Sequence, residues 1–215
     1  MGGKMARLIV CGIGSLGSLL TKSLASDVRD EHTITVLDFD KVEERNVRAN
    51  TQAYTSEMIG LPKTEALQFI LHKMNRKINI INREIMDEYD AKLIVSPLIL
   101  RKELDSPAYN EDTDSFDLVI DCLDNFEARS AITEACTHIP CVHLGFGKNF
   151  TWSILWNEGY QPPKTAVDWD ICEMENAASF VRFVASIGSL VIQNYLKTGK
   201  QREFNGNKFS IREII

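Results

Sequence analysis

Residues 12–17 read Gly-Ile-Gly-Ser-Leu-Gly, a glycine-rich turn between an apolar run and a helical pattern. Glycines at this spacing permit a tight turn and let the backbone approach phosphate groups, and the following helix start offers free N–H groups and a positive dipole end. Asp38 ends the next apolar run about 20 residues further on, where a carboxylate can accept hydrogen bonds from ribose hydroxyls. A glycine turn that serves only helix–sheet packing is the alternative, but the position of Asp38 favours nucleotide binding.

The glycine turn and Asp38 alone leave NAD, FAD, SAM and ATP open as ligands. Further blocks follow in a fixed order, and they are Val36–Asp40, Val42, Asn46, Gly60–Lys63, Asp121–Asn125 and Arg129. With these blocks the sequence resembles the ThiF–MoeB–HesA superfamily, whose adenylation domain is that of the ubiquitin-activating enzymes. The resemblance extends from about Arg7 to Leu155 and continues more faintly into the last long helix.

The resemblance implies an ATP-dependent adenylyltransferase that activates a carboxylate with the help of Mg²⁺. The implied substrate is the C-terminus of a ubiquitin-like or sulfur-carrier protein, or a peptide. The implied nucleotide-binding residues are Gly12, Gly14, Ser15, Leu16, Gly17, Asp38, Asp40, Asn46, Lys63, Cys122, Leu123, Asp124, Asn125 and Arg129. The implied catalytic residues are Lys63, Asp124 and, in place of an absent arginine, Arg48.

Each of these roles fits the chemistry of adenylation. Asp38 would bind the ribose with Asp40 beside it, and Asn46 would face the phosphates. Attack of a carboxylate on the α-phosphate builds negative charge on the phosphate oxygens and on the departing pyrophosphate, which preorganised cations oppose. Lys63 would supply one such charge. Mg²⁺ needs only one or two carboxylates beside phosphate oxygens and water, so Asp124 alone would suffice as its protein ligand.

Four of these residues have simpler interpretations. Lys63 could be a solvated lysine at a helix start, although the helix dipole disfavours a cation there. Asp121 and Asp124 could cap the helix that follows. Arg129 could pair with an acid on its own helix. The position of Asp124 at the carboxyl end of a strand favours a ligand-binding role, because doubly wound sheets bind ligands at that edge.

The pattern departs from the superfamily at two places. Members usually follow the asparagine with an arginine and a glutamine, whereas Ala49 and Asn50 stand here. Arg48 and Arg45 are the candidates to replace that arginine. Many members also hold zinc with paired C-x-x-C motifs, which this chain lacks, so we expect no structural zinc.

These departures leave two alternatives to adenylation. The first is a catalytically weak module that binds ATP and a partner protein. The second is an NAD(P)-dependent oxidoreductase, which the glycine turn and Asp38 fit equally well but the later blocks do not require. Two further residues have open roles: Cys172, whose acidic neighbours argue against a catalytic thiol, and His143, which would line the substrate cleft or simply pack in the core.

The elements that must position these residues form an α/β fold. We expect a Rossmann-like doubly wound sheet, mostly parallel, with antiparallel strands on its C-terminal side, in one domain over residues 1–215. The expected strands are 6–11, 33–37, 78–81, 118–120, 141–144 and 150–156, and a hairpin over 201–215 that turns at Asn205–Gly206. The expected helices are 15–25, one opened by Pro62, one from Asn125 and 176–196, with short helical turns within 41–56. Residues 93–115 read as an insertion or loop and 157–175 as a crossover loop.

The composition limits the partners. A net charge of −6 argues against a general nucleic-acid binder, although tRNA is not excluded. The longest apolar segment, 177–196, is interrupted by Arg182, Gln193 and Asn194, so we expect no membrane span. Five irregularly spaced cysteines indicate a reduced, cytoplasmic protein. Because relatives commonly form dimers, we expect a homodimer to which the helix over 176–196 could contribute.

Overall fold

The fold is described by a computed structural model over residues 5–27, 32–95, 116–158, 160–163, 170–207 and 210–214. The strands are β1 Arg7–Cys11, β2 Thr33–Leu37, β3 Asn79–Ile81, β4 Leu118–Asp121, β5 Cys141–Gly147, β6 Thr151–Trp156, β7 Glu203–Asn207 and β8 Ser210–Ile214. The helices are α1 Ser15–Asp27, α2 Glu44–Arg48, α3 Lys63–Lys73, α4 Glu88–Val95, α6 Phe126–Ala135 and α7 Ala177–Thr198. Short 3-10 turns are η1 Ser56–Met58, η2 Lys148–Phe150 and η3 Ile171–Glu173.

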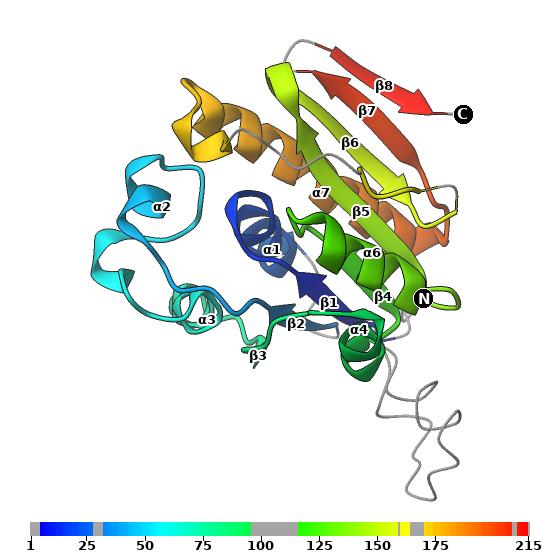
Figure 1. Cartoon of the computed structure of the whole chain (residues 1–215), viewed down its shortest axis with the longest axis horizontal. Helices are drawn as coiled ribbons and strands as arrows, with labels where there is room; N and C mark the ends of the chain where they lie inside the picture. Colours follow the sequence, from blue (N-terminus) through cyan, green and yellow to red (C-terminus); the bar gives the residue numbers. More distant parts are fainter. Residues whose placement is uncertain are drawn as a thin grey trace, which may run out of the picture.

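All described strands belong to one mixed sheet in the order β3-β2-β1-β4-β5-β6-β7-β8 (Figure 1). Strands β3, β2, β1, β4 and β5 pair in parallel, and β6, β7 and β8 add antiparallel pairs. The expected mixed, mostly parallel α/β fold is therefore confirmed. The chain moves outward from β1 to β3 in one direction and from β4 onward in the other, so the strand order reverses between β1 and β4. Sheets of this type bind ligands at the carboxyl ends of the strands beside such a reversal.

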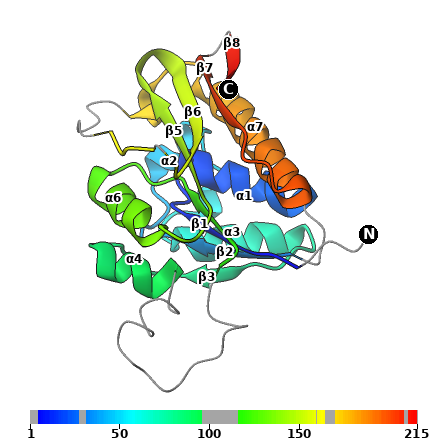
Figure 2. The same cartoon turned by 90° about the vertical axis from the view of Figure 1, so that its right-hand side faces the viewer.

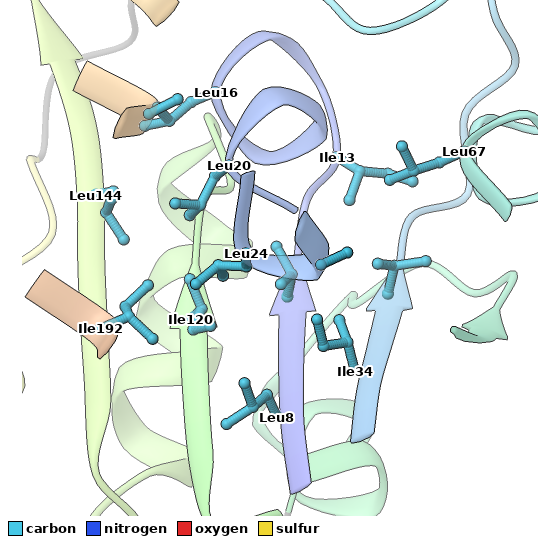
Figure 3. Close-up of a cluster of buried hydrophobic side chains, with 14 of the residues drawn as sticks. Leu8, Ile13, Leu16, Leu20, Leu24, Ile34, Leu67, Ile120, Leu144 and Ile192 are labelled. Carbon is cyan, nitrogen blue, oxygen red and sulfur yellow. The ribbon is translucent and has the colours of Figure 1, made fainter. Parts of the chain in front are cut away.

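Helices cover both faces of the sheet (Figure 2). Alternate residues of β1 divide between two cores, because successive side chains of a strand point to opposite faces. Leu8 and Val10 pack with α1, α3 and α7, whereas Ile9 and Cys11 pack with α4 and α6. Figure 3 shows strand residues of the first core opposite Leu20 of α1. These buried aliphatic side chains each stabilise the fold by about 1.5–3 kcal/mol.

Helix α7 is the described helix whose length and apolar composition would suffice to cross a membrane. Half of its apolar window is buried inside the fold, where it lies beside α1. Gly188 permits this close approach, since a Cβ there would meet the side chains of Leu20 and Leu144. Packing in the core therefore accounts for the apolar character of α7.

The structure corrects two expectations about secondary structure. Residues 93–95 are not loop, because they form the last turn of α4, a helix that the sequence did not predict; the rest of the expected insertion, 96–115, lies outside the described residues. The hairpin does not turn at Asn205–Gly206, because both residues lie within β7 and pair with β8. Gly206 is needed there for a different reason: a Cβ would lie 2.1 Å from the Ser210 carbonyl oxygen and 3.0 Å from the ring of Trp152.

Candidate functional site

The glycine turn between β1 and α1 is held tightly to its neighbours. Gly12 has a φ of +82°, which disfavours any side chain, and a Cβ there would lie 3.0 Å from the Cys122 carbonyl and the Leu123 nitrogen. A Cβ on Gly17 would overlap the Gly12 carbonyl. Among the described residues, nothing lies within 4 Å of where a Gly14 Cβ would be. The turn is thus packed on its inner side and open at Gly14, as an approaching phosphate requires.

Asp38 fastens this turn to the end of β2. Its Oδ2 accepts a hydrogen bond from the Ile13 N–H at 2.8 Å, and its Oδ1 accepts one from the Asp40 N–H at 2.9 Å. Burial raises the pKa of Asp38, while nearby Lys63 and the two N–H groups oppose that rise. The carboxylate therefore shapes the phosphate turn. Each oxygen keeps a second lone pair, so binding of ribose by Asp38 stays a prediction.

Lys63 and Asp40 meet beside Asp38. The Lys63 Nζ lies 2.7 Å from the Asp40 Oδ2, and the lysine side chain is only 9% exposed. The Lys63 backbone N–H also donates to the Asp40 carbonyl at 2.9 Å, which joins the start of α3 to the end of β2. Lys63 is thus no freely solvated surface lysine. The structure brings these three predicted site residues together, with the lysine charge balanced by a neighbouring acid.

Helix α2 carries Asn46 and Arg48, whose side chains are engaged within the protein. The Asn46 Oδ1 accepts the Glu43 N–H at 2.9 Å, so this amide caps its own helix. Arg48 is exposed and pairs with Glu173 at 3.5 Å. Neighbouring Arg45 pairs with Asp170 at 3.3 Å. These ion pairs connect α2 to η3, and contact of Asn46 or Arg48 with a phosphate stays a prediction.

The thiol of Cys172 in η3 lies over the start of α1. Its Sγ is 3.6 Å from the Ser15 Oγ and 3.3 Å from the Thr51 Oγ1, and the Gln52 Nε2 approaches it at 3.8 Å. This contact places the crossover segment beside the glycine turn, a juxtaposition that no sequence motif indicated. Ser15 is a predicted site residue, and Leu16 beside it is buried in the core.

On the far side of the turn is the loop after β4. Some residues of this loop contact the rest of the protein, and others are exposed to solvent. Asn125, not Asp121 or Asp124, caps α6, because its Oδ1 accepts the Ala128 N–H at 2.7 Å. Partly buried Cys122 and Leu123 pack their backbone on Gly12. Asp124 is exposed, and within the described part of the chain no hydrogen bond or ion pair engages its carboxylate.

The donor set at Asp124 suits Mg²⁺ rather than a metal that needs a full protein cage. The described residues contain no cluster of three or more histidine, cysteine or acidic groups that could hold an ion. A single free carboxylate at the strand edge fits Mg²⁺, which takes its other ligands from phosphates and water. The five cysteines are free.

Arg129 is buried, and its guanidinium is hydrogen-bonded to other groups of the protein. Its guanidinium donates to the carbonyls of Leu123 and Leu144 and, at 2.6 Å, to the Tyr160 hydroxyl. It also lies 3.5 Å from the Asp121 carboxylate, so its acid partner is on the preceding strand and not on its own helix. The structure thus gives Arg129 a positioning role between α6, β5 and the crossover segment, and a contact of this residue with nucleotide stays a prediction.

Asp121 at the end of β4 and His143 within β5 form a second buried pair. The His143 Nδ1 lies 2.8 Å from the Asp121 Oδ2, and both side chains are fully buried. Burial alone would raise the pKa of Asp121, but Arg129, His143 and the Leu123 N–H together lower it. Tyr160 stacks on the imidazole with ring centroids 3.7 Å apart. The sequence left the role of His143 open and carried no signal for Tyr160, because that residue follows no motif.

Comparisons with known proteins agree with this geometry. The ThiF family model matches residues 4–153. A molybdopterin-synthase adenylyltransferase from Haemophilus influenzae is 28% identical over 138 residues, which are 63% of this chain and 48% of that protein. A ubiquitin-like modifier-activating enzyme 5 from Drosophila ananassae is 33% identical over 131 residues, which are 59% of this chain and 30% of that protein. The chain thus spans about half the length, or less, of these two relatives.

Solved structures show the same fold. Escherichia coli MccB, solved with ATP, superposes with a TM-score of 0.69 at 18% identity, covering 98% of this chain and 64% of that one. PaaA superposes with a TM-score of 0.66 at 18% identity, with the same coverage of this chain. The fold, the order of the motifs and a family match over more than half of the sequence lead to one conclusion: the chain belongs to the ThiF family.

Proposed function

We propose that this protein adenylates a carboxylate with ATP, and that the carboxylate is the C-terminus of a ubiquitin-like or sulfur-carrier protein or of a peptide. One arrangement carries the proposal. An open glycine turn, fastened by Asp38, lies on one side of the strand reversal, and the carboxylate of Asp124, which no described residue engages, lies on the other. The names of the relatives, an adenylyltransferase and a modifier-activating enzyme, support the same activity.

In this mechanism the protein positions charge, and the substrate supplies the nucleophile. The N–H groups at the start of α1 would hold phosphate oxygens over Gly14 and Ser15. Asp124 would hold Mg²⁺, which lowers the cost of charge on the phosphates when it is bound. Lys63 would offset the charge of the departing pyrophosphate once its pairing with Asp40 is exchanged for phosphate. Asp38 would keep the turn in shape throughout.

A second candidate is an ATP-binding module with little turnover, and the pairing of the cations favours it. Lys63 is paired with Asp40, Arg48 with Glu173 and Arg129 with Asp121. A cation that stays in its ion pair does not neutralise the charge of a bound triphosphate, and little turnover would follow. Membership of the ThiF family favours both candidates over an NAD(P)-dependent oxidoreductase.

ATP–pyrophosphate exchange tests the proposal. The full chain is assayed with Mg²⁺, a panel of ubiquitin-like proteins ending in Gly-Gly and short peptides. We expect exchange with at least one partner, reduced by about tenfold or more in Asp124→Asn and Lys63→Met. Arg202→Gln is the control, since Arg202 pairs with Glu213 in the C-terminal hairpin. ATP binding without exchange for any partner would favour the second candidate, and NAD binding without ATP binding would reject both.

The assembly and location of the protein belong to the same proposal. We infer a homodimer, with the exposed side of α7 as one contact surface, because Leu190 is 65% exposed there and Phe183 is 37% exposed. Sedimentation of the purified chain over a range of concentrations tests this, and a monomer throughout would reject it. A cytoplasmic location stays a prediction.

A further inference from the structure

Beyond adenylation, the buried Asp121–His143 pair has no part in the proposed chemistry. A carboxylate that attacks the α-phosphate carries no proton to remove, so adenylation itself needs no base. His143 nevertheless has its Nε2 buried without a hydrogen-bond partner in the described structure. An unpaired buried polar atom is costly, and a phenylalanine would stack on Tyr160 equally well. The Nε2 of His143 is therefore able to accept a hydrogen bond from a bound group.

The partners of His143 fix which nitrogen carries the proton. Asp121 is ionised, because Arg129 and the Leu123 N–H stabilise its charge. A carboxylate only accepts hydrogen bonds, so the Nδ1 of His143 must donate to it. The neutral imidazole then has its free lone pair on Nε2. This lone pair lies in the plane of the ring, whereas Tyr160 covers the ring face.

The sheet register places His143 near the glycine turn. Cys11, which directly precedes Gly12, pairs with Asp121, and Asp121 pairs with His143. Two strand spacings therefore separate the backbone of His143 from the start of the turn, about 10 Å. With the ribose beside Asp38, as proposed above, an acyl group on the α-phosphate would lie on the opposite side of the turn, toward β4 and β5. His143 lies on that side, across β1 and β4 from Asp38 and Lys63.

We propose that His143 is the general base of a second step, in which a protic nucleophile such as a primary amine attacks the acyl adenylate. The amine nitrogen forms a bond to the acyl carbon, the bond from that carbon to the phosphate oxygen breaks, and AMP leaves. The proton of the amine passes to the Nε2 of His143. Asp121 holds the tautomer and stabilises the imidazolium, and Arg129 keeps Asp121 ionised. This inference rests on the proposed adenylation.

The tautomer is tested without any substrate. The chain has four histidines, so the ring signals of His143 in ¹⁵N-histidine-labelled protein are identified by their loss in His143→Gln. We expect a protonated Nδ1 and an unprotonated Nε2 near neutral pH. A protonated Nε2 in the neutral ring would overturn the inference, because that nitrogen could not accept a proton.

The transfer step is tested with the carboxylate that gives the strongest pyrophosphate exchange and with glycinamide as the amine. We expect His143→Gln to retain exchange within about twofold while amide formation falls about 10²-fold. In His143→Ala, added imidazole should restore amide formation. His138→Gln is the matched control, since His138 is exposed at the end of α6. Thermal melting confirms that each variant is folded.

The outcomes separate this inference from the proposed function. Normal exchange with unchanged amide formation in His143→Gln would overturn the base and leave adenylation intact. Parallel loss of exchange and amide formation in a folded variant would place His143 in the first step and also overturn the inference. No exchange in the wild type would reject adenylation, and the transfer role with it.

Discussion

Replacement of Asp38 tests the claim that this carboxylate shapes the glycine turn. Asp38→Ala removes the acceptor of the Ile13 N–H, whose residue is fully buried, so no water replaces it. It also frees the Asp40 N–H, but Asp40 is exposed and water can bond there. One unsatisfied buried donor costs about 1–3 kcal/mol. Because burial raises the pKa of Asp38, relief of that burial offsets part of the loss.

The net loss for Asp38→Ala is therefore about 1–2 kcal/mol, or a melting temperature lower by about 2–8 °C in a chain of this size. Asp38→Asn keeps an oxygen for the Ile13 N–H and should lose less than half as much. Urea unfolding followed by the fluorescence of buried Trp152 and Trp156 measures both. Equal destabilisation by the two variants, or wild-type stability in Asp38→Ala, would show that the Asp38 carboxylate does not hold the glycine turn in place. ATP affinity should fall in the same order as stability.

Three further changes test other parts of the site. Gly17→Ala forces α1 away from the Gly12 carbonyl and should cost about 1–3 kcal/mol in urea unfolding; a neutral effect would contradict the tight turn. Asp121 has a pKa below its ordinary value of 3.8, so the stability it contributes is present above pH 3.8 and is lost as the pH falls through the lower folded value. The free energy of unfolding of the wild type should therefore fall more than that of Asp121→Asn on acidification below pH 3.8. An equal fall in both proteins would show that ionisation of Asp121 contributes nothing to stability. Asp40→Asn releases Lys63 from its ion pair and should tighten ATP binding in calorimetry, whereas weaker binding would mean that the pair itself holds the nucleotide.

The sheet and the glycine turn could be predicted because local and global signals agree there. The apolar run before Gly12 forms β1, and Pro62 precedes α3 as expected. The predicted run 33–37 is β2 with the same bounds. The antiparallel side was also expected, but its hairpin turn was not. An Asn-Gly pair usually marks a turn, yet Gly206 lies within β7, where the Ser210 carbonyl and the Trp152 ring leave no room for a Cβ.

The contacts of the candidate site could be predicted only in part. The sequence placed Asp38 and Lys63 at neighbouring positions through their motifs, and the structure brings them together. The sequence could not show that Lys63 forms an ion pair with Asp40 or that Arg129 donates hydrogen bonds to backbone carbonyl groups. Side-chain pairing depends on loop paths that no periodicity encodes. Tyr160 reaches His143 from a crossover segment without a motif, for the same reason.

A structure of the full chain with a non-hydrolysable ATP analogue and Mg²⁺ tests the central claim most directly. We expect phosphate oxygens on the N–H groups of Gly14 and Ser15, the ribose beside Asp38 and the metal on Asp124. A nucleotide bound elsewhere, or a glycine turn left empty at saturating analogue, would contradict it.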